Sequence, residues 1–489
     1  MMTAMATDSS PKPRFKKLKK AFLLYPPTGF YMRDDRCQAP VEGMTAQPPR
    51  APIDLATMAA VLEENDLEVI IKDYPAEKGT WDSFRADFVR FEPDLLAISA
   101  TTPTLDRDMQ ACKIAKELRP ECITVIKGAH FTGGEDANVM EKHPYLDIAI
   151  RGESELTVKY LTQFENPSDV YGVTYRKDGQ IIRTKNRDRL DDLDKLPIPA
   201  RHLLNNNLYL SPDTHKPITM INTARGCPFL CTYCAVPIVS GQRVKIRSPE
   251  SVVEEIQECV DRYGIRDFFF RADTFTWDKK WVIRICQLIV ERGLKIRWGA
   301  NSRCDSIDEE RLTWMKKAGC YVIAFGAESV HQETLDKVKK KLKPEQTIKA
   351  VHLTKKHGIK VYLLMMIGFA WETPKMIQET IDFACNLPAD FVEFAIPYPL
   401  PGTEMEKLYK EMKLIRGETL TGHDYTDPTV DSLHLTRDQL LDFRRKAITK
   451  FYTRPQRVLR HLMSIRSPYV LWNYAKAGIR LTRKLASLK

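Results

Sequence analysis

The sequence predicts an α/β protein made of a doubly wound parallel sheet followed by a partial barrel of six βα units. Two observations lead to this class. Short apolar strands alternate with amphipathic helices in residues 21–165 and again in residues 218–410, which is the order of parallel sheets with helical crossovers. Glycine, threonine and charged residues directly follow several of these strands, where parallel sheets bind ligands. The other residues are assigned to a basic disordered tail (1–20), a hairpin and linker (166–217) and a helical carboxyl-terminal extension (411–489).

The first domain is expected to contain five strands separated by helices. Apolar residues at positions 55, 58, 59 and 62 share one helical face, which predicts a helix over about 54–65. The expected strands are 21–25, 67–72, 95–99, 123–127 and 146–150, and the other expected helices are 81–91 and 105–118. Turns rich in glycine or polar residues follow several of the strands, so a ligand site is expected at their carboxyl ends.

The second series of βα units follows a short connector. A hairpin over 170–183, turning at Asp178-Gly179, and an extended stretch near 193–199 are expected first. Six strands are then expected at 218–223, 268–272, 296–300, 322–326, 361–368 and 391–396, with intervening helices such as 252–263 and 347–357. Six parallel strands with crossovers predict a partial barrel whose active site lies at the carboxyl-terminal rim.

Composition and charge limit the function classes. The 489 residues are 43% hydrophobic and carry a net charge of +11. The basic excess lies at the ends, with a net +5 in residues 1–20 and a net +12 in 436–489, which leaves the body slightly acidic. Nucleic acid is therefore not an expected partner. No apolar run is long enough to span a bilayer, and the start lacks a signal-peptide pattern, so a cytoplasmic location is expected.

Three of the eleven cysteines stand together, at Cys227, Cys231 and Cys234. Thiolates this close repel one another unless a soft metal centre neutralises them, which points to zinc or an iron–sulfur cluster. A structural zinc site normally has a fourth nearby ligand. The nearest candidates are Cys259, in an expected helix, and His215, ahead of the strand. A cluster bound by only three thiolates leaves one iron open, which suits catalysis. A zinc site or unligated core cysteines remain as the alternative.

The CxxxCxxC spacing, directly after the first strand of a six-unit barrel, resembles the radical S-adenosylmethionine (SAM) superfamily. The resemblance implies a [4Fe-4S] cluster on Cys227, Cys231 and Cys234, with SAM chelating the fourth iron. It also implies that an electron from an external donor, such as flavodoxin or ferredoxin, cleaves SAM to a 5′-deoxyadenosyl radical.

The same resemblance assigns candidate SAM contacts at later strand ends. Tyr233 would lie against the adenine, Asp273 would accept from the ammonium group, and Arg303 would hold the carboxylate. Glu328 would contact the ribose or amino group, and Gly368 and Tyr398 would flank the adenine. For each charged residue the alternative is an ordinary salt bridge on the barrel rim.

A doubly wound, Rossmann-like domain before such a barrel resembles the cobalamin-binding radical SAM enzymes, the class B methylases and their relatives. The resemblance implies bound cobalamin, with contacts from loops of the first domain at Thr28, Thr101, Gly128, His130 and Gly152. The DxHxxG motif that supplies a cobalt ligand in many cobalamin proteins is absent, so cobalt is expected to lack a protein histidine. The alternative is a domain that has lost cobalamin and only positions substrate.

The implied function is methylation of an unactivated carbon of a lipid, tetrapyrrole or other natural product. Oxidative cyclisation, as in the anaerobic magnesium-protoporphyrin monomethyl ester cyclase branch, is an alternative. A tRNA methylthiotransferase is a further one because Cys231–Pro237 resembles that family's loop, although Cys37, Cys112 and Cys122 are poorly placed for its second cluster. A non-enzymatic cobalamin or iron–sulfur sensor is the third alternative.

The basic carboxyl terminus has two interpretations. Residues 451–489 combine apolar residues at helical spacing with eight or more cations, a pattern that suits a helix in an anionic membrane interface. The other interpretation is a helix packed on the barrel mouth with a solvated basic face. The first would make the protein a peripheral membrane protein.

Overall fold

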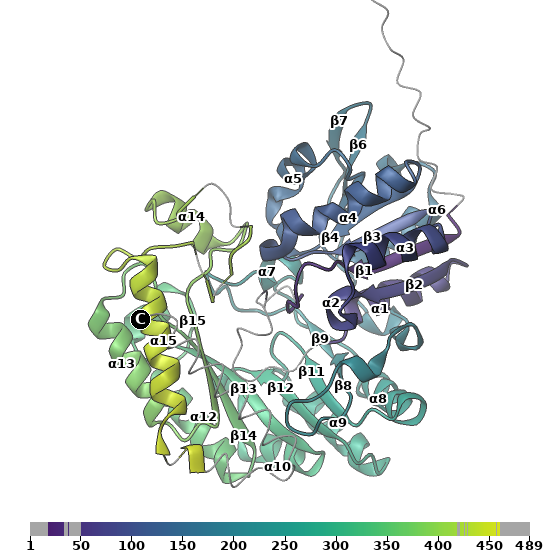
Figure 1. Cartoon of the computed structure of the whole chain (residues 1–489). Coiled ribbons are helices and arrows are strands. Elements are labelled where there is room, and N and C mark those ends of the chain that lie inside the picture. Colours follow the sequence, from purple (N-terminus) through teal and green to yellow (C-terminus); the bar gives the residue numbers. More distant parts are fainter. Residues whose placement is uncertain are drawn as a thin grey trace, which may run out of the picture.

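The computed structural model describes residues 18–33, 38, 50–417, 421–424, 426–427, 429–455 and 457–459. Figure 1 shows two α/β units next to each other, the first in purple to blue and the second in teal to green. The basic tail expected at 1–20 lies outside the described residues except for its last three. Most of the basic segment 451–489, on which the expected membrane contact depends, also lies outside them.

Seven strands form the first sheet, in the order β2-β1-β3-β4-β5-β6-β7. The parallel strands are β1 (Lys20–Tyr25), β2 (Glu68–Asp73), β3 (Leu95–Ser99), β4 (Ile123–Lys127) and β5 (Ile148–Ile150). Because alternate residues of a strand face opposite sides, Ala21 and Leu23 join one core and Phe22 and Leu24 join the other. The expected doubly wound sheet is confirmed, with its topological switch between β1 and β3.

Helices cover both faces of this sheet. Helices α1 (Ile53–Glu63) and α6 (Ser154–Gln163) contribute to one core, and α3 (Trp81–Phe91), α4 (Leu105–Leu118) and α5 (Asp136–Lys142) contribute to the other. The short helix α2 (Tyr74–Glu77) follows β2, and the Asp73 side chain caps it by accepting from the Ala76 amide. Buried apolar side chains on both faces explain why β1 and β3 have no alternating polar positions.

The hairpin formed by β6 (Val173–Lys177) and β7 (Gln180–Arg183) turns at Asp178-Gly179 as expected. Its assignment to the connector is wrong, because β6 pairs antiparallel with β5 and extends the first sheet. Val173 and Tyr175 are buried in the core of that sheet. The local turn signal predicts a hairpin but carries no information on the strand with which it pairs.

The second sheet contains six parallel strands in chain order, which confirms the expected partial barrel. They are β8 (Ile218–Asn222), β11 (Asp267–Arg271), β12 (Arg297–Ser302), β13 (Cys320–Glu328), β14 (Lys360–Met366) and β15 (Phe391–Ala395). The helices of this unit are α8 (Pro249–Tyr263), α9 (Lys279–Glu291), α10 (Glu309–Lys317), α11 (Gln332–Lys337), α12 (Pro344–Lys356) and α13 (Pro374–Asn386). The ladder does not join β8 to β15, so the barrel is open.

Short elements lie between the two units. Strand β9 (Ala224–Arg225) follows β8 and pairs antiparallel with β10 (Lys245–Ile246), and helix α7 (Val236–Val239) lies between them in sequence. Figure 1 shows α7 and β9 at the junction of the first sheet and the barrel. The segment from β8 to β10 therefore connects the barrel to the first domain.

The extension expected to be helical over 411–489 is helical only in part, because its described residues between 412 and 436 form turns and isolated bridges such as that between Ile415 and Val430. Helix α14 (Glu404–Glu411) follows β15, and α15 (Arg437–Tyr452) packs on β15 and α13 (Figure 1). Arg444 of α15 donates to the Phe394 carbonyl at 2.7 Å and to Glu393 Oε1 at 2.8 Å. Among the described helices, none is both long and apolar enough to cross a bilayer.

The two units touch through backbone as well as side chains. A Cβ at Gly133 would lie 2.3 Å from the Pro401 carbonyl oxygen, which only glycine permits. The Gly422 amide donates to the Pro103 carbonyl at 3.0 Å, so the carboxyl-terminal extension also contacts the first domain. These contacts hold the carboxyl ends of both sheets against each other.

Candidate active site

The three cysteines lie on the loop that follows β9, and all three are free thiols that are partly buried. The loop is fixed at its start by the Gly226 amide, which donates to Asp273 Oδ2 at 2.6 Å. Burial, with smaller contributions from the nearby Cys231, Asp273 and Cys227, raises the pKa of Cys234 to about 12, although the Val236 amide opposes the shift. Thiols in this setting stay protonated unless a positive centre compensates the thiolate charge.

The donor set fits an iron–sulfur cluster better than a single ion. In the part of the chain that the structure describes, no three Cys, His, Asp or Glu side chains are grouped to hold one metal ion. A cluster places each thiolate on its own iron, so its ligands need not converge on a point. Cys227, Cys231 and Cys234 are the residues that would hold such a cluster.

Tyr233 and Glu328 meet beside the cysteine loop, together with a residue that the sequence analysis missed. The Tyr233 hydroxyl donates to Glu328 Oε1 at 3.0 Å, and Lys340 Nζ donates to the same oxygen at 2.7 Å. Burial disfavours the ammonium charge, but Glu328 outweighs it and raises the pKa of Lys340. A Cβ at Gly326 would lie 2.8 Å from Glu328 Oε1 and 2.9 Å from Lys340 Nζ, so a side chain there would force the pair to shift.

Arg303 joins the cysteine loop to the turn that carries Lys340. Its guanidinium lies 3.6 Å from the centre of the Phe229 ring, and it donates to the Lys340 and Lys341 carbonyls at 3.0 Å each. It also forms an ion pair with Asp305 at 2.8 Å. These contacts place Arg303 at the site, and its contact with the SAM carboxylate stays a prediction.

Two of the other predicted SAM contacts, Asp273 and Gly368, lie beside the same loop. Asp273 binds the Gly226 amide, as described above. Gly368 has φ +88 and donates to Glu372 Oε2 at 2.8 Å, and its neighbour Phe369 packs on Tyr233 with ring centres 6.4 Å apart. Tyr398 is buried, which raises its pKa. Their roles toward adenine and the ammonium group stay predictions.

We expect Lys340→Met to weaken both the fold and SAM binding. It leaves Glu328 buried without its cation, a change that typically costs about 3–5 kcal/mol. Thermal unfolding and calorimetric titration with SAM measure the two effects. Lys341→Met, at the exposed neighbouring position, is the matched control and should change neither. In the double variant Lys340→Met/Glu328→Gln, recovery of stability without recovery of SAM binding would separate packing from recognition. Unchanged SAM affinity in Lys340→Met would contradict the assignment.

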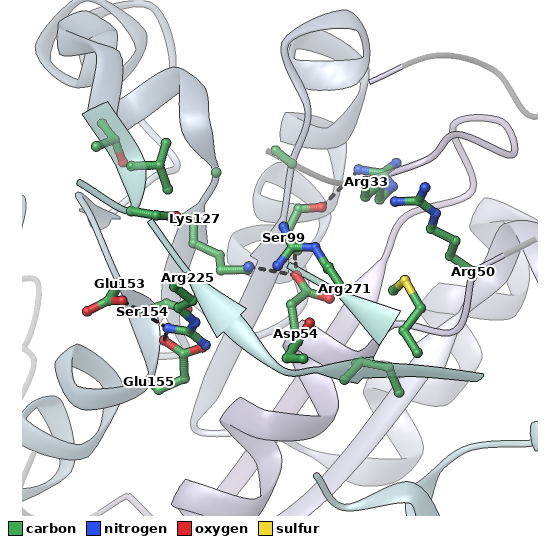
Figure 2. A pocket seen from close by; sticks show the side chains of 18 of the residues that line it. Arg33, Arg50, Asp54, Ser99, Lys127, Glu153, Ser154, Glu155, Arg225 and Arg271 are labelled. Atoms are coloured by element: carbon green, nitrogen blue, oxygen red, sulfur yellow. Dashed lines mark hydrogen bonds and ion pairs between the residues drawn. The ribbon is translucent and has the colours of Figure 1, made fainter. Parts of the chain in front are cut away.

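A pocket opens between the carboxyl ends of the two sheets, with an empty volume of about 990 Å³ including the part open to solvent. Figure 2 shows side chains of the first domain and of the barrel facing each other across it. Asp54 is its best-connected group, because Tyr25, Ser99 and Lys127 all donate to its carboxylate at 2.6–2.7 Å. Burial opposes ionisation, but Lys127 and these donors lower the pKa of Asp54.

Arg225 crosses from the barrel to the first domain at this pocket (Figure 2). It contacts Glu153 at 3.1 Å and Glu155 at 2.6 Å. All three side chains are largely buried, and Arg225 outweighs burial to lower the pKa of Glu155. Because Arg225 lies at the start of the cysteine loop, two residues before Cys227, these ion pairs tie that loop to the first domain.

Arg225→Met is expected to destabilise the protein strongly, because it leaves two buried carboxylates without their cation. The typical cost of breaking a buried pair is about 3–5 kcal/mol. Arg243→Met provides the control: its ion pair with Asp191 is exposed at both ends and should contribute about 1 kcal/mol or less. Urea unfolding of both variants measures the difference. An equal loss in the free energy of unfolding in the two variants would show that the buried ion pairs of Arg225 stabilise the protein no more than the exposed pair of Arg243.

The predicted cobalamin contacts divide into two groups. Gly128 and Gly152 line the pocket, and a Cβ at Gly152 would meet nothing within 4 Å, so open space lies beside it. Thr28, Thr101 and His130 do not line it. Thr28 donates to Asp108 at 2.6 Å, Thr101 shares a 2.7 Å hydrogen bond with Thr104, and His130 lies 3.3 Å from the Thr102 hydroxyl.

These hydrogen bonds hold the side chains of Thr28, Thr101 and His130 within the first domain. Burial lowers the pKa of His130 to about 4, so it is neutral at physiological pH. The pocket lies at the topological switch point of the first sheet, where doubly wound sheets bind ligands. The contacts with cobalamin stay predictions.

The sequence string nearest to the DxHxxG motif begins at Asp213. Asp213 pairs with Arg297 at 2.5 Å, ahead of β8, and does not line the pocket.

The cysteines considered for a second cluster are not available in the described chain. Cys112 and Cys122 are fully buried in the core of the first domain, and burial raises the pKa of both thiols. Cys37 lies outside the described residues. The described residues therefore give no support to the methylthiotransferase alternative.

Comparisons with known proteins agree with this architecture. Residues 221–384 match the family model of the Radical SAM superfamily, and residues 45–162 match the B12 binding domain. An uncharacterized methyltransferase of Pyrococcus horikoshii is 33% identical over 453 residues, which cover 91% of this chain and 95% of that protein. The anaerobic magnesium-protoporphyrin IX monomethyl ester cyclase of Rubrivivax gelatinosus is 28% identical, over 77% of this chain and 68% of that protein.

Among solved structures, the cobalamin-dependent SAM radical enzyme OxsB with aqua-cobalamin and SAM bound matches with a TM-score of 0.72. The match covers 95% of this chain and 71% of OxsB at 16% sequence identity, so it shows a shared fold. The two family models cover the two units described above, and the Pyrococcus relative spans nearly the whole chain. The chain therefore belongs to the cobalamin-binding radical SAM enzymes, whose cofactors are a [4Fe-4S] cluster, SAM and cobalamin.

Proposed function

We propose that this enzyme is a methyltransferase that adds a methyl group to an unactivated carbon of a small molecule, lipid or tetrapyrrole. The observation that carries the proposal is the pocket between the two sheets. It is bounded by loops of the B12-binding unit on one side and, on the other, by Arg225, two residues from the first cysteine. When bound, the cluster and SAM supply a 5′-deoxyadenosyl radical and cobalamin supplies the methyl group.

The residues of the chain position these partners and exclude water. Cys227, Cys231 and Cys234 would bind the cluster, and the group formed by Tyr233, Glu328 and Lys340 offers polar contacts for the SAM nucleoside and amino acid. The pair Glu328–Lys340 is buried, so its orientation is fixed before SAM arrives. On the side of the first domain, the open space beside Gly152 leaves room for part of cobalamin, and Gly128 lets the chain pass close to the Ala100 carbonyl.

Two of the relatives support different outcomes for the same architecture. The Pyrococcus protein is described as a methyltransferase, and the Rubrivivax protein as a cyclase. The longer coverage and higher identity of the first relative favour methyl transfer. Oxidative cyclisation is the second candidate function, and it rests on the similarity to the cyclase over three quarters of the chain.

The test is anaerobic purification in the presence of cobalamin, followed by reduction with dithionite and measurement of 5′-deoxyadenosine and S-adenosylhomocysteine. A methyltransferase produces both, because one SAM molecule yields the radical and another recharges cobalamin. Deoxyadenosine without S-adenosylhomocysteine, in protein that carries cobalamin, would overturn methyl transfer in favour of cyclisation. Neither product from protein with a full cluster would overturn both candidates.

A further inference from the structure

The outer side of the cysteine loop carries exposed apolar side chains. Leu230, between the first two cysteines, is 48% exposed, and Trp277, after β11, is 44% exposed. Phe229 packs edge-on against Trp277 with ring centres 5.9 Å apart, so these residues form one surface. We call Phe229, Leu230 and Trp277 the cysteine-loop patch. Large apolar groups gathered on a surface mark contact sites for other molecules.

A run of lysines borders this patch. Lys337, Lys339, Lys341 and Lys343 are exposed and alternate with the buried residues Val338, Lys340 and Leu342. Lys337 and Lys339 pair with Glu333 and Glu404 at 2.7 Å each. Among the described residues, no carboxylate lies within ion-pair distance of Lys341 or Lys343, so the run carries excess positive charge.

The lysine run and the patch are joined to the cysteines by direct contacts. Cys231 Sγ lies 3.9 Å from the Lys339 carbonyl, and the Thr232 amide donates to the Val338 carbonyl at 3.1 Å. The Arg303 guanidinium touches the Phe229 ring and the Lys341 carbonyl at once. The basic run is therefore the rim of the cysteine loop.

The two sides of the loop face different surroundings. Arg225, at its start, lines the pocket between the domains, where cobalamin and substrate are proposed to bind. Leu230, inside the CxxxCxxC sequence, faces solvent. A protein that approaches Leu230 would reach the cysteines without entering the pocket. This side of the loop is thus open to a macromolecular partner while the other side holds the reaction.

We propose that the cysteine-loop patch and its lysine rim are the docking surface for an acidic, one-electron donor protein of the flavodoxin type. This inference rests on the proposed function, because a cluster that cleaves SAM must first receive one electron. The donor's cofactor loses that electron and the cluster gains it, and no covalent bond forms or breaks in this step. Redox partners bind through small, weak interfaces, and complementary charge speeds their encounter. A small apolar centre with a basic rim has those properties.

The experiment uses full-length protein with reconstituted cluster and cobalamin, and a reduced bacterial flavodoxin as the probe. In Lys341→Glu/Lys343→Glu, the dissociation constant for flavodoxin, measured by surface plasmon resonance, should rise about tenfold. The rate of cluster reduction by flavodoxin, followed by visible absorption, should fall by a similar factor at low salt. Rising salt should slow reduction of the wild type, because it screens attraction, and speed reduction of the variant, because it screens repulsion.

Two further variants separate the effect of local charge from that of net charge and from that of apolar contact. Lys142→Glu/Lys177→Glu makes the same change in net charge at exposed positions of the first domain and should bind flavodoxin like the wild type. Trp277→Ala removes apolar contact and should weaken binding at low and high salt alike. Reduction by dithionite should be equal in all variants, because a small reductant needs no docking surface.

The docking proposal fails if the charge-reversed variant at 341 and 343 binds flavodoxin and accepts electrons from it as the wild type does. It also fails if Lys142→Glu/Lys177→Glu loses as much flavodoxin affinity and as much of the reduction rate, because the net charge of the protein alone would then explain the effect. Failure of the proposed function is distinguishable: dithionite-reduced wild type would then form no deoxyadenosine, whatever flavodoxin binding shows.

Discussion

Replacing Cys227, Cys231 and Cys234 together with alanine is expected to abolish the iron–sulfur cluster and all formation of 5′-deoxyadenosine. The three thiols are the only cysteines of the described chain that share one loop, and the other described cysteines are buried. Without thiolates, the remaining oxygen and nitrogen donors of the loop have little affinity for a soft iron–sulfur centre. The expected loss is complete rather than partial.

Iron and acid-labile sulfide content, together with the visible absorption of anaerobically reconstituted protein, measure this effect. Cys286→Ala is the matched control, because this buried thiol lies in the barrel core, where its removal leaves only a small cavity. It should keep the cluster. Retention of the cluster signature in the triple variant would mean that other residues bind it, and the assignment of the site would be wrong.

The triple variant should stay folded, and this makes the result interpretable. The three side chains are partly exposed and lie in a loop, whereas the strands of the barrel are held by buried apolar residues that pack with those of the helices. We expect its thermal midpoint, measured without cluster, to match that of the apo wild type within a few degrees. Loss of the cluster would then report on ligation alone.

The parallel strands and several of the helices of both units could be predicted because their signals are local, whereas short elements such as α7, β9 and β10 were missed. Strand β3 and helices α3 and α4 begin and end where apolar periodicity and breaker residues place them. The pairing of β6 with β5 could not be predicted, since an antiparallel edge strand carries the same local pattern whether or not a sheet accepts it. The cysteine spacing is likewise a short-range signal, and the predicted cluster site rests on it.

The partners of the site residues depend on long-range contacts and could not be predicted. Lys340 sits in a run of lysines that resembles an exposed surface, and only its contact with Glu328, twelve residues earlier, reveals a buried ammonium. Arg225 meets two glutamates about seventy residues earlier in the chain. Both cases show that the charge of a residue can be read from sequence while its burial and partner cannot.

Gly226→Ala is expected to prevent cluster assembly although every cysteine is retained. Gly226 has φ +92, a conformation that costs other residues about 1–2 kcal/mol. Its added Cβ would lie 2.1 Å from the Arg243 carbonyl oxygen and 2.9 Å from the Arg243 carbonyl carbon. These are backbone atoms, so no side-chain rotation relieves the clash.

Neither backbone can move without losing contacts that shape the loop. The Cys227 amide donates to the Gly241 carbonyl at 3.1 Å, and Arg225 pairs with Lys245 across β9 and β10. Relief of the clash must therefore displace Cys227 or separate β9 from β10. Overpacking of this kind adds about 1–3 kcal/mol to the conformational cost, for a total of about 2–5 kcal/mol.

Gly179→Ala isolates the conformational part of this cost. Gly179 has a similar φ of +79 in the β6–β7 turn, but a Cβ there would meet nothing within 4 Å. It should lose about 1–2 kcal/mol in urea unfolding and keep a full cluster. If Gly226→Ala also kept its cluster and lost no more stability than Gly179→Ala, the close approach of the loop to Arg243 would have no role in placing the cysteines. A larger loss together with an empty loop would instead show that backbone contact, and not only the three thiols, forms the cluster site.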